Sequence, residues 1–114
     1  MTEQKGIGAG FKYDLGKLRF SLIPLSVIWA LMAVLDFGAR KYQAHSWRNV
    51  ENAKERYYDA LMRHVMDYRG GNHIDEESGL PTLAHAYACL TFLLAIELEE
   101  LGIQSFGKST KHVG

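Results

Sequence analysis

The residues with the most suggestive chemistry lie between positions 56 and 85, where histidine, carboxylate and arginine side chains gather. Helical spacing puts His64 and Asp67 one turn apart on the same helix surface. A break at Gly70-Gly71 and an acidic turn follow, and a second helix then brings in His85. Imidazole and carboxylate groups suit a divalent cation, and arginine suits a phosphate. We therefore predict a cation and phosphate site at this helix junction; for each histidine taken alone, a hydrogen-bonded core residue is the alternative.

The acidic turn itself is a second candidate feature. Asp75, Glu76 and Glu77 stand directly before Ser78-Gly79. Three neighbouring carboxylates form a cup for a hard cation, which would offset their mutual repulsion. The alternative is an acidic cluster that complements the dipole of the next helix.

Basic and aromatic residues outside the helices could recognise a nucleotide. Lys12, Lys17 and Arg19 form a basic arm around a turn, which either contacts phosphates or is a flexible tail. Further on, Trp47 stands beside Arg48, with His45 nearby. An aromatic plane with cations can stack a base and hold a phosphate. Alternatively, Trp47 anchors its loop in the core.

Composition limits the possible classes of protein. A chain of 114 residues fits one domain, and 13 basic against 13 acidic residues give no net charge. We therefore expect no binding to a nucleic-acid polymer, which usually requires a basic surplus. The single cysteine, Cys89, and the lack of an apolar leader favour the cytoplasm. Residues 22–37 are apolar but too short to span a bilayer, so we expect no membrane partner.

Apolar periodicity, prolines and glycines predict an all-α fold of three main helices with an irregular N-terminal arm. The helices should cover about 24–42, 52–69 and 81–101, with Gly70-Gly71 and Gly102 as stops. Asn52 is expected to cap the second helix with Glu55 reaching back. We assign residues 1–20 to the arm, 21–102 to a helical nucleotide-binding domain and 103–114 to a polar tail.

The first predicted helix is apolar on nearly all sides, so it should be buried on most of them. A small monomer can hardly cover it, and we therefore expect a homo-oligomeric bundle. Asp36 is the one acid in this helix and needs a partner; Arg40, four residues on, would be the simplest one.

Six short blocks occur together in one order. They are Lys12-Tyr13-Asp14-x-Gly16-Lys17-x-Arg19, Phe37-Gly38-Ala39-x-Lys41-Tyr42, Trp47-Arg48, Tyr57-x-x-Ala60-Leu61-x-Arg63-His64, Asp75-x-Glu77-Ser78-Gly79-Leu80 and Leu83-Ala84-His85-Ala86. This pattern resembles the phage dATP/dGTP diphosphohydrolase N-terminal domain family, considered related to the MazG-like all-α nucleotide pyrophosphohydrolases. The resemblance implies hydrolysis of purine deoxynucleoside triphosphates to monophosphate and pyrophosphate with Mg²⁺ or Mn²⁺, in the host cytoplasm if the protein is phage-encoded.

The resemblance also implies roles for individual residues. The catalytic candidates are His64, Asp67 and His85, and the metal candidates are Asp67, Asp75 and Glu77. The candidates for binding the nucleotide are Lys12, Lys17, Arg19, Lys41, Tyr42, His45, Trp47, Arg48 and Arg63. The Glu-Glu-x-x-Glu block typical of MazG-like enzymes does not occur here. The alternative is therefore a non-catalytic phage protein that sequesters a nucleotide or a nucleotide-derived signal.

Overall fold

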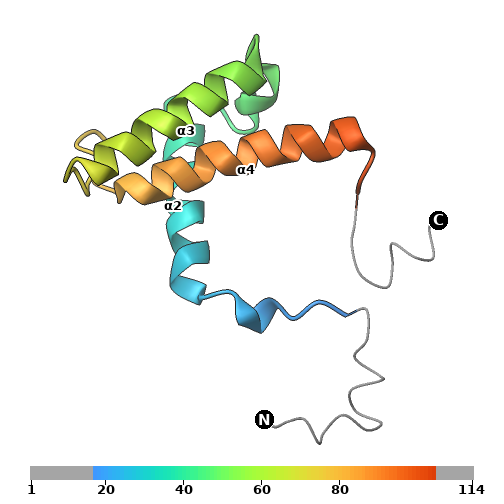
Figure 1. Cartoon of the computed structure of the whole chain (residues 1–114), viewed down its shortest axis with the longest axis horizontal. Helices are drawn as coiled ribbons and strands as arrows, with labels where there is room; N and C mark the ends of the chain where they lie inside the picture. Colours follow the sequence, from blue (N-terminus) through green and yellow to red (C-terminus); the bar gives the residue numbers. More distant parts are fainter. Residues whose placement is uncertain (1–16, 105–114) are drawn as a thin grey trace, which may run out of the picture.

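The computed structural model describes residues 17–104, and this part of the chain is helical (Figure 1). The elements follow in the order η2 (Phe20–Leu22), α2 (Leu25–Lys41), η3 (Ser46–Asn49), α3 (Ala53–Arg69) and α4 (Thr82–Leu101). The two η elements are short 3-10 turns; η2 precedes α2, and η3 lies between α2 and α3. Within the described residues the extended pairing is limited to one bridge, Ile74 with Pro81. The predicted all-α class with three main helices is confirmed.

Prolines and glycines set the helix ends as the sequence predicts. Pro24 and Pro81 stand just before α2 and α4, where their missing N–H groups leave no helical hydrogen bond unmade. Gly102 ends α4 with a left-handed φ of 72°, which glycine adopts at little cost. Asn52 is the N-cap residue of α3, as predicted, but the predicted capping hydrogen bond is not formed. Asn52 adopts a left-handed φ of 56°, and its side chain makes no capping hydrogen bond.

The core of the structure lies where α2 crosses the start of α4. Val34 of α2 packs with Ala84 and Ala88, which are one turn apart on α4. Thr82 and Ala86 are buried on the opposite side of the same helix, so the first two turns of α4 are covered on two sides. Because these side chains are small, the neighbouring helices can approach α4 closely.

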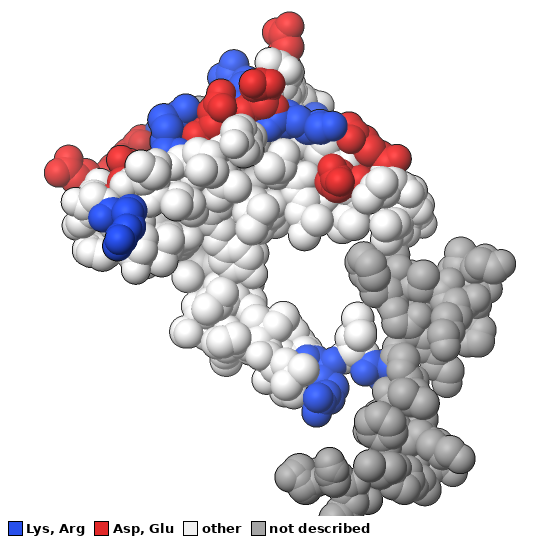
Figure 2. Space-filling view, in the orientation of Figure 1, with Lys and Arg blue, Asp and Glu red and all other residues white. Residues whose placement is uncertain are grey.

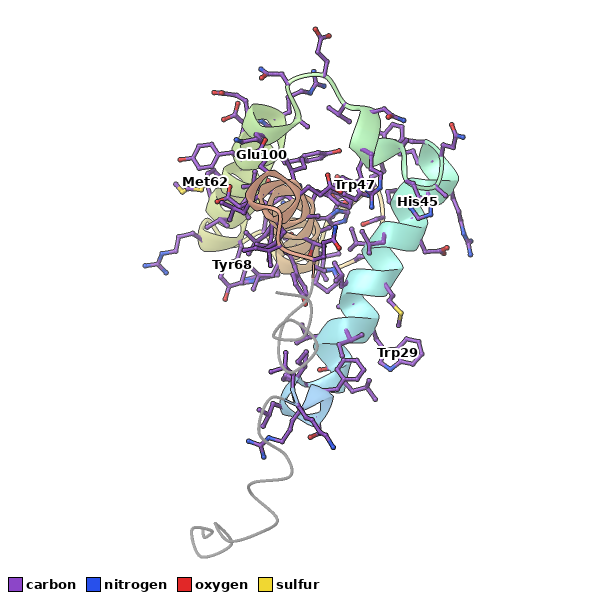
Figure 3. All side chains as sticks on the ribbon, turned by 90° about the vertical axis from the view of Figure 1, so that its right-hand side faces the viewer. Trp29, His45, Trp47, Met62, Tyr68 and Glu100 are labelled. Carbon is purple, nitrogen blue, oxygen red and sulfur yellow. The ribbon has the colours of Figure 1, made fainter. Side chains whose placement is uncertain are left out.

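Helix α2 is covered along only part of its length. Its C-terminal half crosses the α3–α4 pair, and its N-terminal half projects away from it (Figure 1). Leu25, Trp29 and Met32 are exposed, and Trp29 points away from α4 (Figure 3). The predicted burial of this helix is therefore not achieved by the residues that the structure describes. Asp36 pairs with Arg40 at 2.9 Å, as predicted.

Helix α4 has the length and mean hydropathy that would allow it to cross a membrane, judged by composition alone. In the structure it lies along α3, and the loop that joins the two helices is at one end of the pair (Figure 1). Core helices of globular proteins have the same composition, so this finding does not by itself indicate a membrane segment.

Thr82→Val should stabilise the protein by about 1 kcal/mol. The Thr82 side chain is 2% exposed, and its hydroxyl has no hydrogen-bond partner among residues 17–104. Urea unfolding would measure the change. Thr91→Val is the matched control, because the Thr91 hydroxyl donates to the Tyr87 carbonyl at 2.8 Å and should not be replaced favourably. A destabilised Thr82→Val variant would contradict the reading of an unsatisfied hydroxyl.

Candidate functional site

The loop between α3 and α4 is organised by the carboxylate of Asp75. The backbone N–H and the hydroxyl of Ser78 both donate to Asp75 Oδ2, each at 2.9 Å. The backbone N–H of Ser78, above all, lowers the pKa of Asp75, and the Ser78 hydroxyl and the nearby His85 and His64 act in the same direction. Asp75 is therefore an ionised, locally satisfied side chain that shapes the turn.

Ser78 connects this turn to α4 and fixes the protonation of His85. Its Oγ lies 2.7 Å from His85 Nε2 and accepts the Leu80 N–H at 3.1 Å. Because the hydroxyl hydrogen goes to Asp75, Oγ must accept from His85 as well, which places a proton on Nε2. Asp75 Oδ2 approaches the same nitrogen, at 3.6 Å. A nucleophilic triad needs the acid on the other ring nitrogen, so this group is not one.

His64 of α3 stacks beside His85 of α4, with ring centroids 5.5 Å apart. The structure therefore brings together the two histidines that the sequence singled out. Burial lowers the pKa of His64, and the neighbouring His85 lowers it further, against the opposing influence of Asp67 and Asp75. His64 is thus a neutral imidazole near pH 7, able to accept a proton.

The predicted metal ligands do not converge on one point. Glu77 pairs with Lys41 of α2 rather than facing Asp75. Asp67 lines a shallow hollow on α3 next to His64. Across residues 17–104, no group of three or more His, Cys, Asp or Glu side chains is placed to hold a metal ion. The described residues therefore do not form a preassembled Mg²⁺ or Mn²⁺ site.

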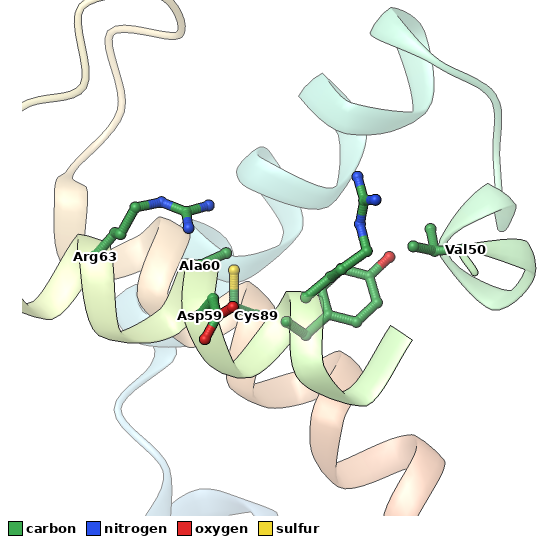
Figure 4. A pocket seen from close by; sticks show the side chains of 7 residues that line it. Val50, Asp59, Ala60, Arg63 and Cys89 are labelled. Atoms are coloured by element: carbon green, nitrogen blue, oxygen red, sulfur yellow. The ribbon is translucent and has the colours of Figure 1, made fainter. Parts of the chain in front are cut away.

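A groove between α3 and α4 is the best-defined hollow near these residues. It encloses about 400 Å³ and is lined by Val50, Arg56, Tyr57, Asp59, Ala60, Arg63 and Cys89. Arg63 stands at one end and Val50, from the loop before α3, at the other (Figure 4). Ligand pockets commonly have volumes of about 300–1,000 Å³, so the groove has room for a small molecule.

The two arginines of the groove form no ion pair with any residue that the structure describes. Asp59 and Asp67 flank Arg63 at four residues on either side, which is the spacing of helical ion pairs, but neither pair forms. Arg63 was predicted to bind a phosphate. Arg56 was not assigned a role, although its seven-residue spacing from Arg63 places both on one helix face.

Two groups in the wall of the groove keep their protons. Burial raises the pKa of the Cys89 thiol, although the charge of Arg63 acts in the opposite direction. Burial also raises the pKa of Tyr57, whose hydroxyl donates to the Trp47 carbonyl at 3.2 Å. Neither side chain is an activated nucleophile, so the groove offers binding rather than covalent chemistry.

The indole of Trp47 is occupied within the chain. It stacks on Phe92 with centroids 4.8 Å apart, and the guanidinium of Arg48 lies 4.6 Å from its centroid. Arg48 also pairs with Glu99 at 2.9 Å. With Phe92 on one face and Arg48 against the ring, the indole is an anchor for η3, the alternative reading of the sequence. The prediction that Trp47 stacks a base is not supported by this packing.

The remaining predicted nucleotide contacts are dispersed. Lys17 and Arg19 are exposed beyond the free end of α2, away from the groove (Figure 1), and Lys12 lies outside the described residues. Exposed Tyr42 lies beneath Lys41, whose ammonium is 5.2 Å from the ring centroid. His45, with a left-handed φ of 66°, precedes η3 in the same region as Trp47 (Figure 3). Of the eight predicted contacts that the structure describes, Arg63 alone lines the groove.

The arrangement is that of a small helical protein with a cationic groove beside a paired-histidine centre. A family model described as "dATP/dGTP diphosphohydrolase, N-terminal" matches residues 8–105, and the chain belongs to this family. A curated protein, the dATP/dGTP diphosphohydrolase of Salmonella phage PMBT28, is 37% identical over 84 residues. That match covers 74% of this chain but 28% of the phage protein. No solved structure matches the chain significantly.

Lowering the pH from about 7 to about 5 should destabilise the protein through His64. The unfolded residue, with a pKa of 6.5, takes up a proton that the folded residue, with its lowered pKa, resists. This contribution is complete above pH 6.5 and is lost as the pH falls. Urea unfolding at several pH values should show a shallower pH dependence in His64→Gln. The control is His45→Asn, an exposed site where Asn suits the left-handed backbone. An unchanged pH profile in His64→Gln would refute this assignment.

Proposed function

We propose that the groove between α3 and α4 binds a purine deoxynucleoside triphosphate and that the protein hydrolyses it to the monophosphate and pyrophosphate. The observation that carries the proposal is the placement of Arg56 and Arg63 in one groove, free of ion pairs with residues 17–104. Membership of the dATP/dGTP diphosphohydrolase N-terminal family and the name of the phage relative support the choice of substrate. Such a reaction would take place in the host cytoplasm.

Charge and shape together favour a phosphorylated ligand. Two guanidiniums on one helix face offer forked donors that match phosphate oxygens. The apolar side chains of Val50 and Ala60 and the ring of Tyr57 line the same groove, where they can contact a base or sugar. Asp59 limits the positive charge at one edge. A nucleotide, with an anionic part and an apolar ring, suits this mixture better than inorganic phosphate does.

The paired histidines supply the proton chemistry in this proposal. Neutral His64 would accept a proton from the attacking water, with Asp67 one turn away to favour the charged form. His85 would act as a positioning residue, because Ser78 holds its Nε2 and the ring stacks beside His64. His64, Asp67 and His85 therefore remain our catalytic candidates, with distinct roles.

Mg²⁺ or Mn²⁺ remains part of the proposal, but as a companion of the substrate. Nucleoside triphosphates bind these cations through their own phosphate oxygens. The carboxylates of Asp75 and Glu77 already have partners in Ser78 and Lys41, so a resident ion has few ligands ready in this chain. We therefore describe the substrate as the metal–nucleotide complex.

The second candidate function is sequestration of a nucleotide or nucleotide-derived signal without turnover. The lack of converging carboxylates among residues 17–104 favours this function. Cationic side chains and a groove suffice for binding, whereas hydrolysis usually needs several acidic side chains at one point. The two functions share the groove and differ in whether the ligand leaves the protein intact.

Arg63→Ala should weaken the binding of dATP or dGTP by about ten- to a hundredfold, because a charge-assisted hydrogen bond to phosphate contributes about 1.5–3 kcal/mol. Arg56→Ala should have a comparable effect, and isothermal titration calorimetry would measure both. Arg69→Ala is the matched control, since Arg69 is an exposed arginine of the same helix that does not line the groove. Equal affinity in all three variants would place the ligand elsewhere.

The 114-residue chain incubated with dATP or dGTP and Mg²⁺ or Mn²⁺ should release pyrophosphate, and His64→Gln should release much less. Coupled pyrophosphate detection, with a chelator as the blank, would measure the rate. Nucleotide that is retained by the protein and recovered intact after denaturation would overturn hydrolysis and support sequestration. A chain that neither binds nor cleaves a nucleotide would contradict both functions.

A further inference from the structure

The face of α4 opposite α3 carries a row of exposed leucines that residues 17–104 leave uncovered. We call Leu83, Leu90, Leu94 and Leu101 the α4 stripe; their side chains are 46%, 47%, 51% and 61% exposed. Together with Tyr87 and Glu97 they follow the alternating four- and three-residue spacing of a coiled-coil seam. Over about 27 Å of helix, this spacing is suited to another helix rather than to an irregular segment.

The spacing of the leucines in the α4 stripe is the same in both directions along the helix. Seven residues separate Leu83 from Leu90, and seven separate Leu94 from Leu101. An antiparallel copy centred at the level of residue 92 would therefore oppose Leu83 to Leu101 and Leu90 to Leu94. The same register opposes Tyr87 to Glu97, a phenol to a carboxylate that can accept its hydrogen bond. A seam that is complementary to itself is what a two-fold symmetric pair requires.

We propose that α4 pairs with α4 of a second copy of this chain, antiparallel and in this register. In each copy the N-terminal half of α2 descends below α4 (Figure 1). Ile23, which precedes α2, and Val27 in its first turn are also exposed. Together with the four leucines they make six exposed apolar residues of on the order of 100 Å² each, which is most of the about 800 Å² per partner that stable interfaces bury. The proposal explains why residues 17–104 leave apolar surface uncovered on both α4 and α2.

The distribution of charge fits the same occupant. Charged side chains gather over α3, whereas the underside of α4 before its acidic C-terminal end and the inner side of α2 are uncharged in this view (Figure 2). Helices α2 and α4 meet at an angle and leave a concave surface between them. A second copy related by a two-fold rotation can fill this concave surface, whereas a flat lipid surface cannot. Because the stripe is opposite α3, the pair leaves the arginine groove open, so the dimer and the nucleotide site can be tested separately.

Light scattering after size-exclusion chromatography should give the full chain twice its 12.9 kDa mass. Leu90→Glu and Leu94→Glu should each shift it to the monomer, because they place like charges in an apolar seam. Met66→Glu is the matched control: Met66 is 64% exposed on α3 and should leave the dimer intact. A monomeric wild type, a dimer that survives both leucine variants, or an equal effect of Met66→Glu would overturn the proposal. A monomer that co-sediments with phosphatidylcholine vesicles would assign the stripe to lipid instead.

Disulfide cross-linking tests the register even where a glutamate variant fails to fold. In a Cys89→Ser background, a mixture of Leu90→Cys and Leu94→Cys chains should oxidise to a cross-linked heterodimer. Each variant alone should cross-link at least tenfold less, because Leu90 would face the partner subunit's Leu94. Efficient cross-linking of Leu90→Cys with itself would indicate a parallel or different pairing and would overturn the antiparallel register. Retained nucleotide binding in a monomeric variant would show that the groove does not depend on the seam.

Discussion

The close approach of α2 and α3 to the first two turns of α4 is the constraint on which the rest of the structure depends. It is made possible by Ala84 and Ala88 on one side and Ala86 on the other, whose methyl groups let neighbouring backbones come near. His85 stands between these rows, so it can reach both the loop and His64. A larger residue in either row would separate the histidines as well as the helices.

The loop between α3 and α4 fixes the hydrogen bonding of His85 and Asp75 through Ser78. Ser78 uses its one hydrogen on Asp75 and its lone pairs on Leu80 and His85, so every polar atom of the hydroxyl is committed. One consequence is a histidine with a fixed tautomer, and another is a carboxylate whose Oδ2 is already occupied. The acidic turn therefore has a structural role, and the arginine groove is the part of the surface to which we assign binding in our proposal.

Sequence alone predicted the helices and the histidine pair well, because both depend on local signals. The helix ends are marked by Pro24, Pro81 and Gly102, because the backbone of each residue is suited to an end. The position of His64 in the helical repeat determines which face of α3 carries it. The direction of long side chains was not predictable. Whether Arg63 would pair with Asp59 or turn into a groove depends on the surroundings of α3, as does the partner of Glu77.

The same limit applies to the loops. Trp47 beside Arg48 has the composition of a base-stacking site, but Phe92, which lies far along the chain, decides that the indole is covered. The left-handed backbone at Asn52 likewise depends on the connection between η3 and α3, and no short sequence pattern predicts it. The sequence pattern therefore identified residues whose side chains could bind a ligand. Tertiary contacts decided which of these side chains already pack or pair with other residues of the chain.

The partial coverage of α2 has a consequence for how the chain is made. Helices α3 and α4 are neighbours in sequence and form a hairpin of local contacts, which can assemble quickly. Helix α2 is synthesised before them, yet its docking partner on α4 leaves the ribosome only much later. During that interval its apolar side chains have nothing to pack against, so the nascent chain passes through a stage in which chaperones and misassembly compete for the same helix.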